Sequence, residues 1–121
     1  MHGCFLLITH CGERLECIVA TSPGKVFYVV RVGHLDVAVA HIEWDAGNKR
    51  WWYGVDVIER FQRKGIGTAL TRAVLADFSD ILWLTCPAHL VDWYRGMGFN
   101  VCVDETIKKA EGQVLMMREP S

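Results

Sequence analysis

The sequence has little of what marks membrane, secreted or metal-binding proteins. Its longest apolar runs, such as 4–8 and 26–30, are far shorter than the ~20 residues of a membrane-spanning helix. No charged segment precedes the first of them, so the N-terminus lacks the pattern of a secretory signal peptide. No Cys-x-x-Cys pair occurs, and the cysteine spacing matches no common zinc pattern or disulfide framework. We therefore expect a cytoplasmic protein without a metal, whose thiols are reduced: Cys4, Cys11, Cys17, Cys86 and Cys102.

An excess of positive charge is also absent. The formal net charge is −1, which argues against a strongly basic surface for nucleic acid, and we expect neither a nucleic-acid partner nor a membrane partner. Hydrophobic residues make up 51% of the chain and charged residues 22%, a composition typical of a packed globular protein rather than a disordered one. The length of 121 residues predicts a single domain, 1–121.

The first half of the chain predicts an antiparallel meander. Runs rich in β-branched and aromatic residues alternate with turn residues. Gly33 and His34 have the pattern of a two-residue hairpin turn with glycine in the first central position. The expected strands are Cys4–Thr9, Leu15–Ala20, Val26–Val32, Leu35–Trp44 and Trp51–Ile58. In the fourth strand, simple alternation predicts one face made of Leu35, Val37, Val39, His41 and Glu43.

The pattern changes after Ile58. Apolar residues recur at helical spacing from Ile66 and predict a helix that ends near Ser79. A buried strand over Ile81–Leu84 follows, then a short helix over His89–Arg95 and two strands, Phe99–Val103 and Val114–Met117. This order predicts an α+β (mixed α/β) fold with one βαβ crossover at its centre.

A glycine-containing basic loop joins the fifth strand to the first helix, and it reads Gln62-Arg63-Lys64-Gly65-Ile66-Gly67. Such a loop can direct successive backbone N–H groups at one point, where the helix N-terminus adds about half a positive charge. Two glycines let a ligand approach the backbone closely. The loop therefore indicates an anion site suited to phosphate oxygens.

This loop resembles the acetyl-CoA signature of the GNAT superfamily of N-acetyltransferases, [Gln/Arg]-x-x-Gly-x-[Gly/Ala]. The segment Trp93–Phe99 looks like the family's Phe-Tyr-x-x-x-Gly-Phe, with tryptophan in place of the first phenylalanine. The ending Val114–Arg118 is similar to the family's closing strand. The resemblance covers 26–118. It implies a GNAT-like acyl-CoA N-acyltransferase fold: a central, mostly antiparallel sheet in which 1–58 form the strand meander and 59–118 the cofactor-binding half.

The resemblance also implies a reaction. Acetyl-CoA is the expected co-substrate, and a primary amine attacks its thioester directly in a ternary complex. The acceptor is a small molecule, or a lysine or N-terminus of a peptide or protein. The strand before the loop is expected to diverge from the 81–84 strand and open a slot for the pantetheine arm. The residues implied in cofactor binding are Val57, Ile58, Gln62, Arg63, Lys64, Gly65, Ile66, Gly67 and Thr68.

Tyr94 matches the tyrosine that, in many members, protonates the leaving thiolate. The base that deprotonates the amine is less plainly marked, because Thr85 occupies one position at which the family often has an acid. Glu43 is the first candidate for the base and His41 the second, since cross-strand pairing is expected to bring them beside the fifth strand.

Simple pairing across the 45–49 turn predicts that Glu43 lies near Trp51 and His41 near Tyr53. On the fifth strand, the residues expected to face the cleft are Trp51, Tyr53 and Val55. Asp56 has the opposite parity and is expected on the helix side, unless a bulge in that strand shifts the alternation.

One departure from the family pattern concerns the segment between Gly24 and Gln62, which has no helical periodicity. Many members place helices there that wall the acceptor site. Aromatic side chains occupy the region instead, so it forms either an open acceptor face or a homodimer interface. Two alternatives to catalysis stay open: a catalytically silent CoA-binding sensor, and a protein-interaction module on the same fold.

Overall fold

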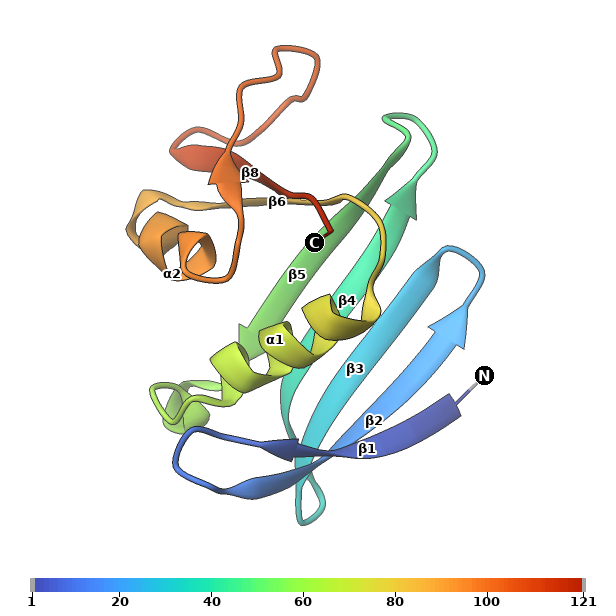
Figure 1. Ribbon diagram of the computed structural model, residues 1–121, viewed down its shortest axis with the longest axis vertical. Helices are drawn as coiled ribbons and strands as arrows, with labels where there is room; N and C mark the ends of the chain where they lie inside the picture. Colours follow the sequence, from blue (N-terminus) through green and yellow to red (C-terminus); the bar gives the residue numbers. More distant parts are fainter. Residues whose placement is uncertain (1, 121) are drawn as a thin grey trace.

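Five antiparallel strands follow one another in chain order through the first half of the protein, as the sequence predicts. The computed structural model describes residues 2–120. Each strand pairs with its predecessor along nearly its whole length, which gives a continuous meander (Figure 1). The strands are β1 His2–Ile8, β2 Arg14–Ser22, β3 Lys25–Val32, β4 Leu35–Asp45 and β5 Arg50–Val57. Gly33 adopts a positive φ of 61° in the tight turn between β3 and β4, and this confirms the predicted hairpin.

The second half completes a sheet with the order β1-β2-β3-β4-β5-β6-β8-β7. Its elements are the 3₁₀ turn η1 Glu59–Phe61, α1 Ile66–Asp77, β6 Leu82–Pro87, η2 Ala88–Leu90, α2 Val91–Arg95, β7 Asn100–Val101 and β8 Gln113–Arg118. The predicted helices and strands are all present. β7 is shorter than the predicted Phe99–Val103, and β6 extends three residues beyond the predicted Leu84.

The parallel pair β5 and β6 separates soon after it begins. Only two residue pairs join the strands, Trp51 with Leu82 and Trp52 with Trp83. β5 nevertheless continues to Val57 and β6 to Pro87. Figure 1 shows the two strands running apart at a wide angle. Helix α1, which follows β5 and precedes β6 in the chain, crosses one face of the sheet. The predicted divergence of these strands is confirmed.

Helix α1 packs on one face of the meander and contacts β1, β3, β4 and β5. The phenolic oxygen of Tyr53 and the hydroxyl of Thr71 share a buried hydrogen bond of 2.8 Å between β5 and α1. Trp51 packs edge-on against Phe78 with ring centroids 5.6 Å apart. The face with Trp51 and Tyr53 is therefore the helix side. The prediction that Asp56 lies on that side is wrong, because its parity is opposite.

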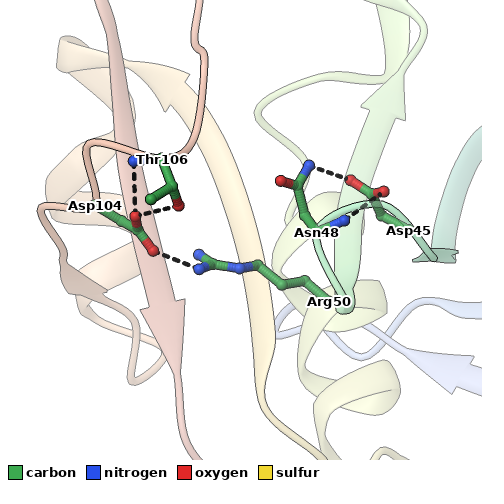
Figure 2. Close-up of polar contacts among 5 residues, drawn as sticks. All are labelled: Asp45, Asn48, Arg50, Asp104 and Thr106. Atoms are coloured by element: carbon green, nitrogen blue, oxygen red, sulfur yellow. Dashed lines mark hydrogen bonds and ion pairs between the residues drawn. The ribbon is translucent and has the colours of Figure 1, made fainter.

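The pairing of β4 with β5 is offset by one residue from the prediction. Glu43 lies opposite Trp52, and His41 lies opposite Gly54. The cause is the turn, where the carboxylate of Asp45 accepts hydrogen bonds from the backbone N–H groups of Gly47 and Asn48. Its other oxygen accepts a bond from the Asn48 side chain (Figure 2). These bonds fix residues 46–49 as the loop, so that Asp45 and Arg50 form the β4–β5 pair next to it.

The β4–β5 register runs without interruption from Ala38 with Val57 to Asp45 with Arg50, so β5 contains no bulge. The irregularity lies between β3 and β4 instead, where Val30 pairs with Ala38 and the next pair skips Val37. Val37 is fully buried. The predicted single face through 35–43 is therefore interrupted at Val37.

Candidate active site

The loop after β5 is held in shape by glycine geometry and by one side chain. Gly65 stands immediately before α1 with a φ of 81°, a conformation that other residues adopt only with strain. The side-chain amide of Gln62 donates a 2.8 Å hydrogen bond to the carbonyl of Val57 and fastens the loop to the end of β5. Ile66 is buried, so its side chain anchors the first turn of α1 in the core. The loop therefore presents backbone N–H groups at the helix N-terminus.

A cavity of about 580 Å³ lies beside this loop, where β5 and β6 have separated. It brings together residues from the loop, α1, α2 and the end of β5. The predicted site residues that line it are Val57, Gln62, Arg63, Gly65, Gly67, Thr68 and Tyr94. A second hollow of about 700 Å³ adjoins at Gln62 and Arg63 and includes Ile58. Lys64 lies instead near the ring of Phe61, with Nζ 5.6 Å from the ring centroid.

Six further residues line the cavity: Val55, which was expected to face the cleft, and five that were not assigned to the site, namely Asp56, Phe61, His89, Leu90 and Trp93. His89 and Leu90 follow the carboxyl end of β6, a position at which ligands commonly bind in open sheets with parallel strands. That positional rule was the available signal for them. Asp56 was missed because its face was assigned wrongly.

Tyr94 is the most enclosed polar residue of the cavity, with 6% of its surface exposed. Burial, with smaller contributions from nearby Cys86 and Asp56, raises the pKa of the Tyr94 phenol to about 12. Its ring packs edge-on against Trp93 and Phe99, with centroids 4.7 and 5.6 Å away. The phenol therefore keeps its proton throughout the neutral range.

Trp93 joins the two helices at the cavity. Its indole Nε1–H donates a 2.9 Å hydrogen bond to the hydroxyl of Thr68 in the first turn of α1. The edge of the same indole lies 3.7 Å from where a Cβ on Gly67 would stand. A phenylalanine at position 93 would pack similarly but lacks this donor.

The two candidate bases lie outside the cavity lining. Glu43 pairs with Lys25 across β3 and β4 at 3.2 Å, and both side chains are about half exposed. His41 is partly buried, and its imidazole lies over Gly54 of β5. His41 of β4 thus rests on the backbone of β5 outside the cavity lining, and Glu43 is in an ion pair with Lys25 of β3.

Within residues 3–120, no cluster of three or more His, Cys, Asp or Glu side chains is arranged to hold a metal ion. In the same range, no helix is long and apolar enough to cross a membrane. The cysteines are unpaired there, and Cys17 and Cys86 are buried in the core.

Comparison with known proteins gives a consistent result. The family model described as "Acetyltransferase (GNAT) family" matches residues 7–99. No curated protein matches the sequence. The GNAT domain of S. lividans PAT superposes with a TM-score of 0.77 at 9% identity, over 94% of this chain and 95% of that one.

Two other solved structures are similar in fold. The ribosomal-protein-S18-alanine N-acetyltransferase from Escherichia coli has a TM-score of 0.66 at 18% identity, over 84% of this chain and 72% of that one. A GNAT family acetyltransferase from Elizabethkingia anophelis, solved with acetyl-CoA bound, has a TM-score of 0.62 at 18% identity, over 80% of this chain and 77% of that one.

Proposed function

The chain belongs to the acetyltransferase (GNAT) family, and on that premise we propose that it transfers the acetyl group of acetyl-CoA to a primary amine. One observation carries the proposal: the cavity lies where β5 and β6 separate and is bounded by the Gln62–Gly67 loop. A slot between two strands can receive an extended arm, and a loop at a helix N-terminus can receive phosphates.

The residues present fit the diphosphate of coenzyme A. Gly65 and Gly67 both line the cavity, and a Cβ on Gly67 would have only ordinary contacts, the nearest at 3.5 Å. The loop backbone would hold the diphosphate, Arg63 at the rim would add positive charge, and the end of β5 near Val57 would hold the pantetheine arm. Lys64, near the Phe61 ring, and Ile58, in the adjoining hollow, would border the diphosphate site from the outer side of the loop.

We propose that catalysis rests on orientation and on one buried acid. Holding the amine and thioester together can supply up to ~7–11 kcal/mol of the barrier. Tyr94 lines the cavity as a neutral phenol and would give its proton to the departing sulfur. The acceptor class is a small amine or the lysine or N-terminus of a peptide. One structural neighbour is, by its name, an N-acetyltransferase of a ribosomal-protein alanine, so N-terminal peptides belong among the first acceptors tested.

Thermal unfolding with and without acetyl-CoA tests the cofactor assignment directly. Ligand at 100 times its dissociation constant adds about 2.7 kcal/mol of stability, which corresponds to several degrees for a chain of this size. We expect a clear upward shift with acetyl-CoA and also with CoA alone. No shift at millimolar acetyl-CoA would overturn the proposal. Where a shift is seen, release of the CoA thiol in the presence of amines then tests turnover.

A further inference from the structure

The imidazole of His41 lies directly on the backbone of Gly54, across the β4–β5 pair. A Cβ on Gly54 would stand 2.8 Å from Cε1 and 3.3 Å from Cδ2 of His41, and closer still to Nε2. All three of its nearest atoms would belong to this ring. The ring of Phe27 stands on the other side, with centroids 6.2 Å apart. Because Gly54 has no side chain, the imidazole can lie directly on the β5 backbone.

This position is at the edge of the slot. The last pair between β5 and β6 is Trp52 with Trp83, so β5 has no β6 neighbour at Gly54. The next residue, Val55, lines the cavity. Because Tyr53 faces α1, Gly54 and His41 belong to the opposite face of the sheet. His41 therefore lies on the face of β5 opposite α1, beside a strand residue whose neighbour lines the cavity.

Most of the other charged groups on this face form ion pairs with each other, and Asp56 is the exception. Lys25 of β3 and Glu43 of β4 pair with each other. Asp56 of β5 lies two residues beyond Gly54 and is exposed. Further along, Arg31 and Asp36 form their own pair at 2.8 Å. Asp56 and His89 line the cavity themselves, whereas His41 is the imidazole that lies on the β5 backbone where the strands part.

We propose that His41 is the general base of the reaction and that the acceptor amine reaches the slot from the sheet face opposite α1. This inference rests on the proposed acetyl transfer. Imidazole is the side chain that proteins use most often as a base near neutral pH. Gly54 is its positioning residue.

In the step itself, the lone pair of the amine nitrogen forms a bond to the thioester carbonyl carbon and the C–S bond breaks. His41 accepts the proton that the nitrogen loses, and Tyr94 gives its proton to the leaving sulfur. The imidazolium then releases its proton to solvent, and the phenolate takes one back. The products are the acetylated amine and the CoA thiol.

The first test needs no acceptor. The imidazole signals of His41 are followed by NMR as acetyl-CoA is added, with His34 in the β3–β4 turn as the internal control, while thermal unfolding reports binding separately. We expect the His41 signals to shift and those of His34 to stay. A bound cofactor with unmoved His41 signals overturns the inference but leaves the proposed function standing. Absence of binding overturns both.

The second test is kinetic, with CoA release from three probes: a lysine-free peptide with a free N-terminus, an N-terminally blocked lysine peptide, and spermidine. His41→Gln is expected to lower kcat by ~10²-fold or more and to remove the acid limb of the kcat/KM profile. His34→Gln, the same substitution in the turn, is expected to match the wild type. Loss of that limb in Glu43→Gln or Asp56→Asn, but not in His41→Gln, overturns the assignment.

A third variant tests the positioning role of Gly54. The three atoms nearest the added Cβ of Gly54→Ala would all belong to the His41 ring, so the fold should persist while the imidazole is displaced. We expect a lower kcat with the KM for acetyl-CoA unchanged. A wild-type kcat in Gly54→Ala would show that the position of the His41 imidazole does not affect the reaction, and it would overturn the positioning role of Gly54.

Discussion

Arg50, at the start of β5, forms an ion pair with Asp104 in the β7–β8 connection and so joins the two halves of the sheet at the closed end of the slot (Figure 2). The Arg50 guanidinium also lies 4.0 Å above the ring of Trp83 in β6. Thr106 supplies two further bonds to Asp104, from its backbone N–H and its hydroxyl. These contacts connect the last paired residues of β5 and β6 to the C-terminal strands.

The bonds from Thr106 and the pairing with Arg50 lower the pKa of Asp104 to about 2, from an ordinary value of 3.8. A carboxyl whose folded pKa is depressed stabilises the fold above its unfolded pKa, and that stabilisation disappears as the pH falls from 3.8 toward 2. We expect Asp104→Asn to lower the unfolding midpoint at neutral pH and to flatten its decline in acid. Thermal scans from pH 7 to pH 2 test this. Thr106→Val, which keeps the ion pair, should show a smaller change. Identical scans for wild type and Asp104→Asn would contradict the role of the pair.

Gly67→Asp tests the phosphate site. The substitution places a carboxylate at a position that lines the cavity, so it should repel the diphosphate and abolish binding of CoA. Gly67→Ala is the matched control, because its Cβ would stand 3.5 Å from Val57 and 3.7 Å from Trp93, which are ordinary contacts. Calorimetric titration with CoA measures both. Unchanged affinity in Gly67→Asp would sink the loop assignment.

Substitution of Gln62 tests whether the hydrogen bond between the loop and β5 contributes to CoA binding. Gln62→Met keeps the length of the side chain and adds no charge, but removes the donor for the 2.8 Å bond to the Val57 carbonyl. A hydrogen bond of this kind is worth ~0.5–1.5 kcal/mol, so CoA affinity should fall by up to about tenfold. Arg63→Gln, at the neighbouring rim position, should instead weaken binding in a salt-dependent way. Equal CoA affinity for Gln62→Met and wild type would mean that the loop holds its shape without this bond.

Tyr94→Phe tests the proposed acid. The ring would remain packed against Trp93 and Phe99, whereas the proton of the phenol would be lost. We expect turnover to fall by ~10²–10⁴-fold with CoA affinity nearly intact. Steady-state kinetics and CoA titration measure the two quantities separately. A fully active variant would remove Tyr94 as the proton donor.

The Tyr53–Thr71 bond tests the attachment of α1 to the sheet. Both groups are buried, so removing either partner leaves the other unsatisfied and should cost about 1–3 kcal/mol of unfolding free energy. Tyr53→Phe and Thr71→Val each remove one hydroxyl. Their combination should cost less than the sum of the two, and denaturant unfolding of the three variants measures the coupling. Strict additivity would show that the bond contributes little.

The order of strands and helices could be predicted from short segments of the sequence. The meander follows from runs of β-branched and aromatic residues between turn residues, and these signals act within a few positions of the chain. The loop before Ile66 and the helix after it carry local signals of the same kind. The placement of Tyr94 beside the loop was expected only from the resemblance to the GNAT family, because no local preference brings the two segments together.

The register and the faces of the sheet could not be read in this way. A shift of one residue at Asp45 moved His41 from Tyr53 to Gly54, and the shift depends on side-chain bonds inside the turn. The side of the sheet that α1 covers depends on the crossover and its packing. Asp56 was assigned to the wrong side for that reason.

The sequence by itself determined the order of strands and helices, the shape of the loop and its chemical character, because these depend on neighbouring residues. Tertiary structure alone decided which distant side chains meet. Trp93 bonds to Thr68 across 25 positions, and Arg50 reaches Asp104 across 54. Such contacts arise only when the separated strands and both helices have packed, since no local preference specifies a partner that far along the chain.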